Sequence, residues 1–289
     1  MDISVDREQL RRNLQMIVGE RSPFSGQSHL AAVERFVAKE FENHGLIVES
    51  DFFSYQGKRF RNVIARLGAP REEAVVIIGA HIDSVVGTPG ADDNASGVAV
   101  LLECARILSK AKLQSQVLLC AFNLEELNMI GSAALAKKLK AAGARVGAMV
   151  SLETVGYTNS RPGSQKLPIG LSRFYPDRGD FIGVIGNWRS DALLRKFSEA
   201  MREVPDLPVE TLSVPGNGML IPAVRLSDHS PFWDAGYPAL MVTDTAFYRN
   251  PHYHAGTDSV ETLDIEFMAK VGEGVIHAVT GLCEDGLDQ

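Results

Sequence analysis

The feature that most constrains this chain is an alternation of apolar runs with segments of helical periodicity. Three runs have a continuous apolar centre, as is typical of strands buried on both faces of a sheet: "AVVIIGA" (74–80), "QVLLCAF" (116–122) and "VGAMVS" (146–151). Apolar residues at helical spacing follow the first two runs, at 96–111 and 129–143. This alternation predicts a mostly parallel sheet with helices on both faces.

The flanking regions continue the pattern with further helices and strands. The residues before 74 predict a helix over 28–44, stopped by Gly45, and strands over 46–55 and 61–67. After residue 180 we expect a strand at 181–187, a helix at 190–203, a loop at 215–236, a strand at 237–244 and a helix from Ile265 to Cys283. The sequence therefore predicts a three-layer α/β/α protein with a central, mostly parallel mixed sheet.

Residues 156–180 interrupt the alternation, because they are rich in Gly, Pro, Ser and Arg and show no period. Loops of this length are often functional, so we expect a lid or pocket wall there. No linker composition divides the rest of the chain, and 289 residues with 45% hydrophobic side chains suffice for one large core. We expect a single domain over residues 1–289.

Composition limits the partners of the protein. A net charge of -7 and a pI near 5.5 argue against a nucleic-acid or anionic-membrane surface. We find neither a signal-peptide core nor a continuous apolar run of about 18 residues, so the sequence as written predicts a cytoplasmic protein, or a secreted one if a leader has been removed. The three cysteines lack metal-finger or disulfide spacing and are expected to be reduced core thiols: Cys104, Cys120 and Cys283.

Imidazole and carboxylate side chains follow the predicted strands, at the point where each strand ends. They are His81 and Asp83, Asp92 and Asp93, Glu125 and Glu126, Glu153, and finally His252, His254 and Asp258. The carboxyl ends of parallel strands meet at one edge of a sheet, so these side chains are expected to converge. Such a set suits zinc, which binds His nitrogen and carboxylate oxygen, and a carboxylate can bridge two ions.

Each residue alone also has an ordinary structural explanation. His81 suits a strand end, although Asp83, two residues later on the same strand face, could hold its ring. The adjacent Glu125 and Glu126 suit a helix start, or two carboxylates that divide metal binding and proton transfer. Asp92 and Asp93 suit a helix cap, and spacing does not choose between His252 and His254.

Six motifs in order carry a resemblance to a known family: "AHIDS", "GADDNASGVAVLLE", "NLEEL", "SLETVGY", "SDHSPFWDAGYPALMVTDT" and "HYHAGTDS". Together they resemble the zinc peptidase family that includes bacterial leucyl-type aminopeptidases, glutamate carboxypeptidases and glutaminyl cyclases. The resemblance covers about residues 75 to 262. It implies a single zinc peptidase domain of the phosphorylase/hydrolase-like architecture.

The resemblance also implies a role for each matched residue. Two zinc ions would share Asp93 as a bridge, with His81 and Glu153 completing one site and Glu126 and His254 the other. Asp83 would orient His81, and Glu125 would be the general base. Asp92 would keep a turn or cap role.

Two positions depart from the family pattern. Many members have Asp where this chain has Glu153, and the extra methylene moves the carboxylate by about one carbon–carbon bond. Several members place a Tyr shortly before "SDH" to stabilise the oxyanion, for which Arg225 or Tyr253 could substitute here. Four aromatic residues in nearby runs could line an apolar pocket, but such residues more often belong to the core, so they are left out of the site: Phe232, Trp233, Phe247 and Tyr248.

The leading hypothesis is a zinc-dependent exopeptidase with two zinc ions, an aminopeptidase that acts on small peptides or free N-termini. Glu125 would take a proton from the attacking water and pass it to the leaving amine. The alternatives are a one-zinc glutaminyl-cyclase-like enzyme using Asp93, Glu126 and His254, a carboxypeptidase on the same scaffold, and a non-catalytic binding domain. A peptide is the expected partner; the sequence leaves side-chain preference and oligomeric state open.

Overall fold

A computed structural model describes residues 3–68, 74–168 and 170–284 of the chain. Its centre is an eight-stranded sheet with the order β1-β2-β4-β3-β5-β8-β6-β7. The strands are β1 (Ile47–Tyr55), β2 (Lys58–Leu67), β3 (Val75–His81), β4 (Val117–Phe122), β5 (Val146–Glu153), β6 (Ile182–Asn187), β7 (Val209–Val214) and β8 (Ala239–Thr243).

The middle of the sheet is parallel and its flanks are mixed. Strands β4, β3, β5 and β8 run in the same direction, whereas β2 pairs antiparallel with β4 and β6 pairs antiparallel with β8. Every residue of β4 and β8 is buried, as their continuous apolar composition predicts for strands covered on both faces. The expectation of a mostly parallel mixed sheet is confirmed.

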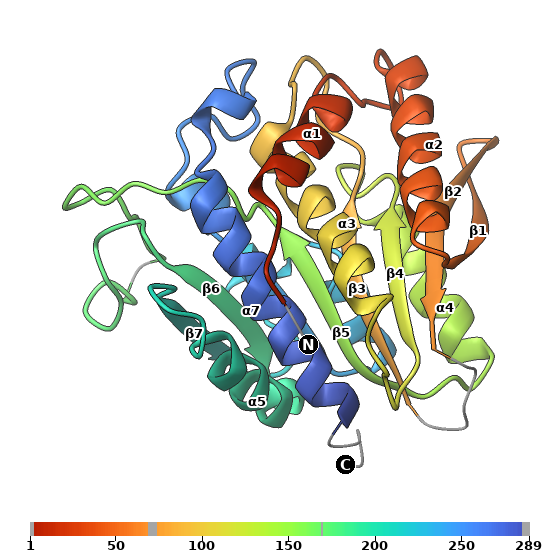
Figure 1. Cartoon of the computed structure of the whole chain (residues 1–289). Helices are drawn as coiled ribbons and strands as arrows, with labels where there is room; N and C mark the ends of the chain where they lie inside the picture. Colours follow the sequence, from red (N-terminus) through yellow and green to blue (C-terminus); the bar gives the residue numbers. More distant parts are fainter. Residues whose placement is uncertain (1–2, 69–73, 169, 285–289) are drawn as a thin grey trace.

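Helices cover both faces of the sheet (Figure 1). One layer holds α1 (Arg7–Ile17), α2 (Gln27–Asn43), α3 (Gly97–Leu108), α5 (Asp191–Met201) and α7 (Ile265–Glu284). The other holds α4 (Ile130–Ala141) and α6 (Ser230–Ala235), which contact each other. Short helical segments join these elements: η1 (Ala91–Ser96), η2 (Trp188–Ser190), η3 (Pro222–Arg225), η4 (Ala246–Tyr248) and η5 (Val260–Thr262).

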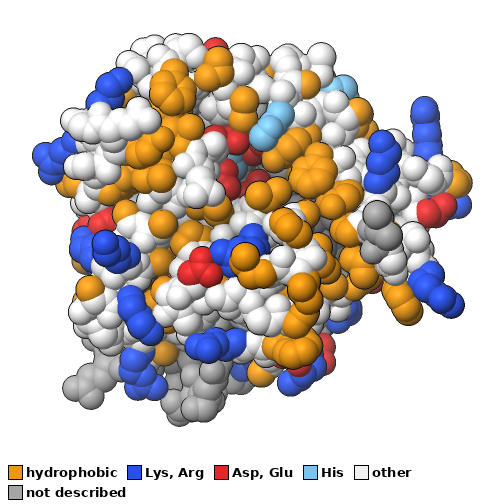
Figure 2. Space-filling view, turned by 180° about the vertical axis from the view of Figure 1, so that it is seen from behind, with side chains coloured by type: hydrophobic (Ala, Val, Ile, Leu, Met, Phe, Trp, Pro, Cys, Tyr) orange, Lys and Arg blue, Asp and Glu red, His pale blue; other side chains and the backbone are white. Residues whose placement is uncertain are grey.

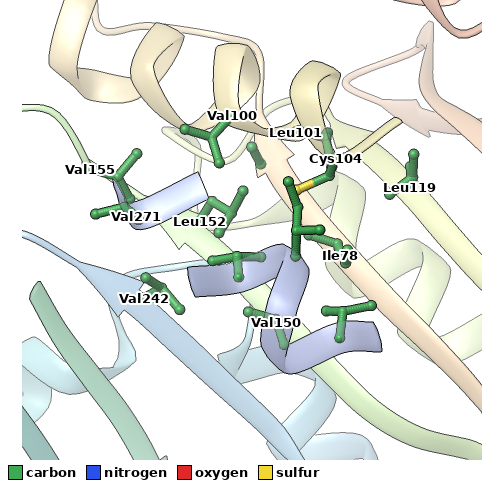
Figure 3. Packing of buried hydrophobic residues seen from close by; sticks show 14 of the residues in the cluster. Ile78, Val100, Leu101, Cys104, Leu119, Val150, Leu152, Val155, Val242 and Val271 are labelled. Atoms are coloured by element: carbon green, nitrogen blue, oxygen red, sulfur yellow. The ribbon is translucent and has the colours of Figure 1, made fainter. Parts of the chain in front are cut away.

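The main core lies between the sheet and the layer of α3 and α7. Figure 3 shows Leu101 and Cys104 of α3 and Val271 of α7 packed against Val150 and Leu152 of β5. All five side chains are buried, and this packing fixes the carboxyl end of β5 relative to its neighbours. The three cysteines are free and buried, as expected.

The sequence pattern did not predict helix α1, strand β7 or the helical segments η3 and α6. Helix α1 precedes the first predicted helix, capped by the Asp6 carboxylate, which accepts hydrogen bonds from Glu8 N and Gln9 N. Strand β7 lies at the sheet edge and is only partly buried, so it lacks an apolar run. The predicted loop 215–236 contains η3 and α6, which are too short to show a period. Within the described residues, no helix combines the length and apolarity needed to cross a bilayer.

Candidate metal centre

Five carboxylate and imidazole side chains meet at the carboxyl ends of the central strands. His81 and Glu153 are the last residues of β3 and β5. Asp93 lies in η1, and the other two follow β4 and β8: Glu126 and His254. Acidic side chains form the floor of a hollow here, with a histidine beside it and hydrophobic side chains around it (Figure 2).

The ligand-competent atoms form two groups that share Asp93. In the first, His81 Nε2 lies 3.1 Å from Asp93 Oδ1 and 3.6 Å from Glu153 Oε2. In the second, His254 Nε2 lies 3.0 Å from Asp93 Oδ2 and 3.3 Å from Glu126 Oε2. Each group could hold one metal ion, and the two oxygens of Asp93 face different groups.

The hydrogen bonding of these atoms fits bound cations. His81 Nε2, Asp93 Oδ1 and Glu126 Oε1 are buried and make no hydrogen bond of acceptable geometry. Buried polar atoms without partners are costly, and in a cluster of His and carboxylate groups a metal ion satisfies them. The residues present therefore fit the metal that the sequence analysis expects.

The electrostatics of the cluster are strongly coupled. Burial lowers the pKa of His81, but the Glu153 and Glu125 carboxylates raise it well above its ordinary value. Burial raises the pKa of Asp93, but the imidazoles of His254 and His81 bring it below its ordinary value. Burial and the Asp93 charge raise the pKa of Glu126 to about 7. The crowded carboxylates lack sufficient countercharge within the protein, which again favours a bound cation.

Glu125 lies beside the first group without belonging to it. Its Oε2 is 3.9 Å from His81 Nε2. Burial, together with the carboxylates of Glu153 and Asp228, raises the pKa of Glu125 well above its ordinary value, although His81 opposes this. A buried carboxylate that holds a proton more readily suits proton transfer near neutral pH.

Asp83 supports three of these residues at once. Its carboxylate lies 3.6 Å from His81 Nδ1. The same carboxylate accepts hydrogen bonds from Glu125 N at 3.0 Å and Glu126 N at 3.1 Å. Asp83 thereby positions both glutamates as well as the histidine.

Glu153 and Asp93 each have a supporting residue that the sequence analysis does not assign. Ser227 Oγ donates to Glu153 Oε2 at 2.8 Å, which orients the longer glutamate side chain. Asp258 accepts from Asp92 N and Asp93 N at 2.9 and 3.1 Å. Ser227 lies in "SDH" and Asp258 in "GTDS", and the spacing of these motifs does not predict either contact.

The structure corrects the cap role of Asp92. Its carboxylate accepts from Gly156 N at 2.9 Å and from Asn250 Nδ2 at 2.6 Å, and no side-chain cap bond is made at the start of α3. Burial and the Asp244 carboxylate raise the pKa of Asp92 well above its ordinary value. Asp92 therefore ties the turn to the segments after β5 and β8.

The two candidates for the oxyanion role lie in different places. Arg225 donates to Asn217 O and pairs with Asp234 Oδ2 at 2.7 Å, and no contact of its guanidinium with the acidic cluster is seen among the described residues. Tyr253 stacks on the His254 ring with centroids 3.9 Å apart. His252 lies outside the cluster, with Nδ1 2.9 Å from Thr257 Oγ1.

An apolar cavity of about 100 Å³ adjoins the cluster. Glu153 and Tyr253 line it beside the metal groups, and five further residues come from the excursion at 156–180: Gln165, Leu167, Pro168, Leu171 and Tyr175. Of the four aromatic residues for which pocket and core were weighed, Phe247 and Tyr248 line this cavity, whereas Phe232 and Trp233 are core residues. The position of Phe247 and Tyr248 shortly after β8 was the sequence signal that they lie near the site.

A mixed α/β sheet with paired carboxylate and imidazole groups past its strand ends defines a metal-dependent hydrolase class. Within that class the chain belongs to Peptidase family M28, whose sequence profile matches residues 62–279. The family resemblance and the expectation of a peptidase are confirmed.

Two curated relatives show how far the similarity extends. YfbL of Escherichia coli strain K12 is 37% identical over 93% of this chain and 86% of the relative. A probable zinc metalloprotease of Leptosphaeria maculans is 29% identical over 78% of this chain. The chain spans 58% of the length of that fungal relative.

Solved structures of related fold include different enzymes. The LapA aminopeptidase of Legionella pneumophila superposes with a TM-score of 0.76, at 19% identity, over 96% of this chain and 72% of that chain. A glutaminyl cyclase of Porphyromonas gingivalis superposes with a TM-score of 0.71, at 19% identity, over 96% and 99%. At these identities the similarity shows the shared fold.

Proposed function

We propose that this protein is a zinc-dependent aminopeptidase that hydrolyses the N-terminal bond of small peptides. The observation that carries the proposal is the pair of ligand groups joined at Asp93, with Glu125 adjacent and unligated. The fungal relative's description as a probable zinc metalloprotease supports zinc as the metal. His81, Asp93 and Glu153 would hold one ion, and Asp93, Glu126 and His254 the other.

Zinc, when bound, supplies positive charge that acidifies water and polarises a peptide carbonyl. The protein's own contribution is to place a base and a binding surface around that charge. Glu125 takes the proton of the attacking water and donates it to the leaving amine. Asp83 positions Glu125 through the backbone bond at Glu125 N, so the base stays beside the ligand groups.

The apolar cavity beside Glu153 would accept the side chain of the first substrate residue. Its lining by Phe247, Tyr248 and Leu171 suits an aliphatic or aromatic side chain. The excursion at 156–180 would act as the wall of this pocket. Tyr253, which lines the cavity and stacks on His254, would stabilise the oxyanion.

Glutaminyl cyclase activity is the second candidate, because the superposition with the Porphyromonas cyclase covers 99% of that enzyme's chain. A digest of a peptide library by the zinc-loaded protein separates the possibilities. Release of N-terminal residues supports the aminopeptidase, C-terminal release supports a carboxypeptidase, and loss of ammonia from N-terminal glutamine supports the cyclase. No change in any peptide would contradict all three and favour a binding domain.

A further inference from the structure

A second concavity lies outside the metal centre, between α4 and α6. This groove has a volume of about 810 Å³. One face of α4 lines it, through residues at helical spacing from Ala133 and Ala136 to Lys137 and Lys140. The alanines at these positions leave open space where longer side chains would fill the groove.

The groove begins next to the metal centre. Met129, three residues after Glu126, lines its upper end and contacts Ser230 of α6, with 3.2 Å between Oγ and Sδ. Leu226 lines both the groove and the apolar cavity beside Glu153. A chain that leaves the metal centre on this side therefore enters the groove.

The far end of the groove is positive in a protein of net charge -7. Lys137 and Lys140 line it and are exposed, and neither forms an ion pair with a described residue. The other charges nearby have partners. Arg225 pairs with Asp234 at 2.7 Å. Lys138, which does not line the groove, pairs with Asp51 at 2.8 Å.

We propose that this groove binds the C-terminal part of the peptide substrate and that Lys137 and Lys140 pair with its free carboxylate. The helical rise places Lys137 about 12 Å beyond Met129. An extended peptide advances about 3.3 Å per residue, so about four residues after the cleaved bond reach the lysines. The inference rests on the proposed aminopeptidase and names its substrate class as short peptides with a free C-terminus.

The test compares the pentapeptide Leu-Gly-Gly-Gly-Gly as free acid and as amide, with leucinamide as a substrate too short to reach the groove. We expect the zinc enzyme to cleave the acid with a kcat/KM about fivefold above that of the amide, the upper range for exposed ion pairs. The ratio should fall to about one in the double variant Lys137→Gln, Lys140→Gln. Lys138→Gln, on the same helix with the same charge change, should keep it.

Equal kcat/KM for acid and amide in the wild type, or an unchanged ratio in the double variant, would overturn the groove assignment. Leucinamide separates this failure from that of the proposed function, since its hydrolysis needs only the metal centre. If leucinamide is inert, binding of the labelled pentapeptides to zinc-loaded Glu125→Gln protein still tests the groove. Tighter binding of the acid that disappears in the lysine variants supports it, and equal binding refutes it.

Discussion

At the residue scale, the two adjacent carboxylates of η1 have separate tasks although they share one turn. Asp93 faces both ligand groups, whereas Asp92 bonds to Gly156 N and Asn250 Nδ2. We predict that Asp93→Asn loses most of its zinc, because one bridging oxygen is removed. Asp92→Asn should lose much less zinc, because the Asp92 carboxylate bonds to Gly156 N and Asn250 Nδ2 and belongs to neither ligand group. Elemental analysis of both variants checks this; equal zinc loss would refute the division.

Glu125 is the residue on which the proposed mechanism depends. Glu125→Gln keeps the backbone bond to Asp83 and removes only the capacity to accept a proton. We predict normal folding and zinc content with leucyl-peptide hydrolysis reduced by a factor of about a hundred or more. Steady-state kinetics measures the hydrolysis rate and circular dichroism checks the fold. An unchanged turnover would contradict the role of Glu125 as general base.

The sequence predicted that the imidazole and carboxylate side chains converge, and the structure brings five of them together, but the sequence did not predict the contacts that support them. His254 and not His252 lies in the cluster, as the family motif implies. The supporting contacts of Ser227 and Asp258 were not predicted, because they depend on how the loops after β7 and β8 fold back on the sheet. Sequence spacing predicts which strand a residue follows. It does not predict which loops fold back to contact that residue.

At the scale of elements, the excursion at 156–180 is held to the rest of the protein by Arg249. Its Nε donates to Gln165 Oε1 at 2.9 Å and its Nη1 donates to Phe181 O at 2.8 Å. Burial lowers the pKa of Arg249, but the Asp244 and Asp92 carboxylates oppose this. The guanidinium therefore ties Gln165 of the cavity wall to the start of β6, within the electrostatic influence of the Asp244 and Asp92 carboxylates.

We predict that Arg249→Met lowers the free energy of unfolding by about 3 kcal/mol, because it leaves the buried acceptors Gln165 Oε1 and Phe181 O without their donor. The KM for a leucyl substrate should also rise, because the cavity wall loses the hydrogen bond between Arg249 and Gln165. Arg178→Met, an exposed arginine of the same excursion, is the matched control and should change neither value. Denaturant unfolding and kinetics check both; identical behaviour of the two variants would refute the role of Arg249.

Long helices with a clear apolar period and strands with a continuous apolar centre were predictable from the sequence. Short helices and edge strands were not. Strands β3, β4 and β5 lie where their apolar runs predict, since burial on both faces leaves a strong pattern. Strand β7 and helix α6 were not predicted, because an edge strand is half-solvated and a six-residue helix spans fewer than two turns. A lid role for the excursion stays a prediction.

At the scale of the whole molecule, a buried neutral histidine links stability to pH. His229 Nε2 lies 2.8 Å from Val224 O, and its ring packs edge-on against Trp233. Burial lowers the pKa of His229 to about 3. Below the unfolded pKa of about 6.5 the unfolded chain gains a proton that the folded protein does not bind, so stability falls as the pH is lowered from 6.5 toward 3.

We predict that this residue alone destabilises the fold by about 2 kcal/mol at pH 5 relative to pH 7. The variant His229→Gln keeps a donor for Val224 O but does not titrate. Urea unfolding at both pH values should show a larger loss in the wild type than in the variant. Parallel pH dependence of the two proteins would contradict the assignment.

The proposed enzyme depends on two zinc ions that share Asp93. Crystals of the zinc-loaded protein, measured at wavelengths on both sides of the zinc absorption edge, test this arrangement most directly. We expect two anomalous peaks about 3.5 to 4 Å apart, one on each side of the Asp93 carboxylate. A single peak at His254, Glu126 and Asp93, with none near His81, would contradict the two-metal centre.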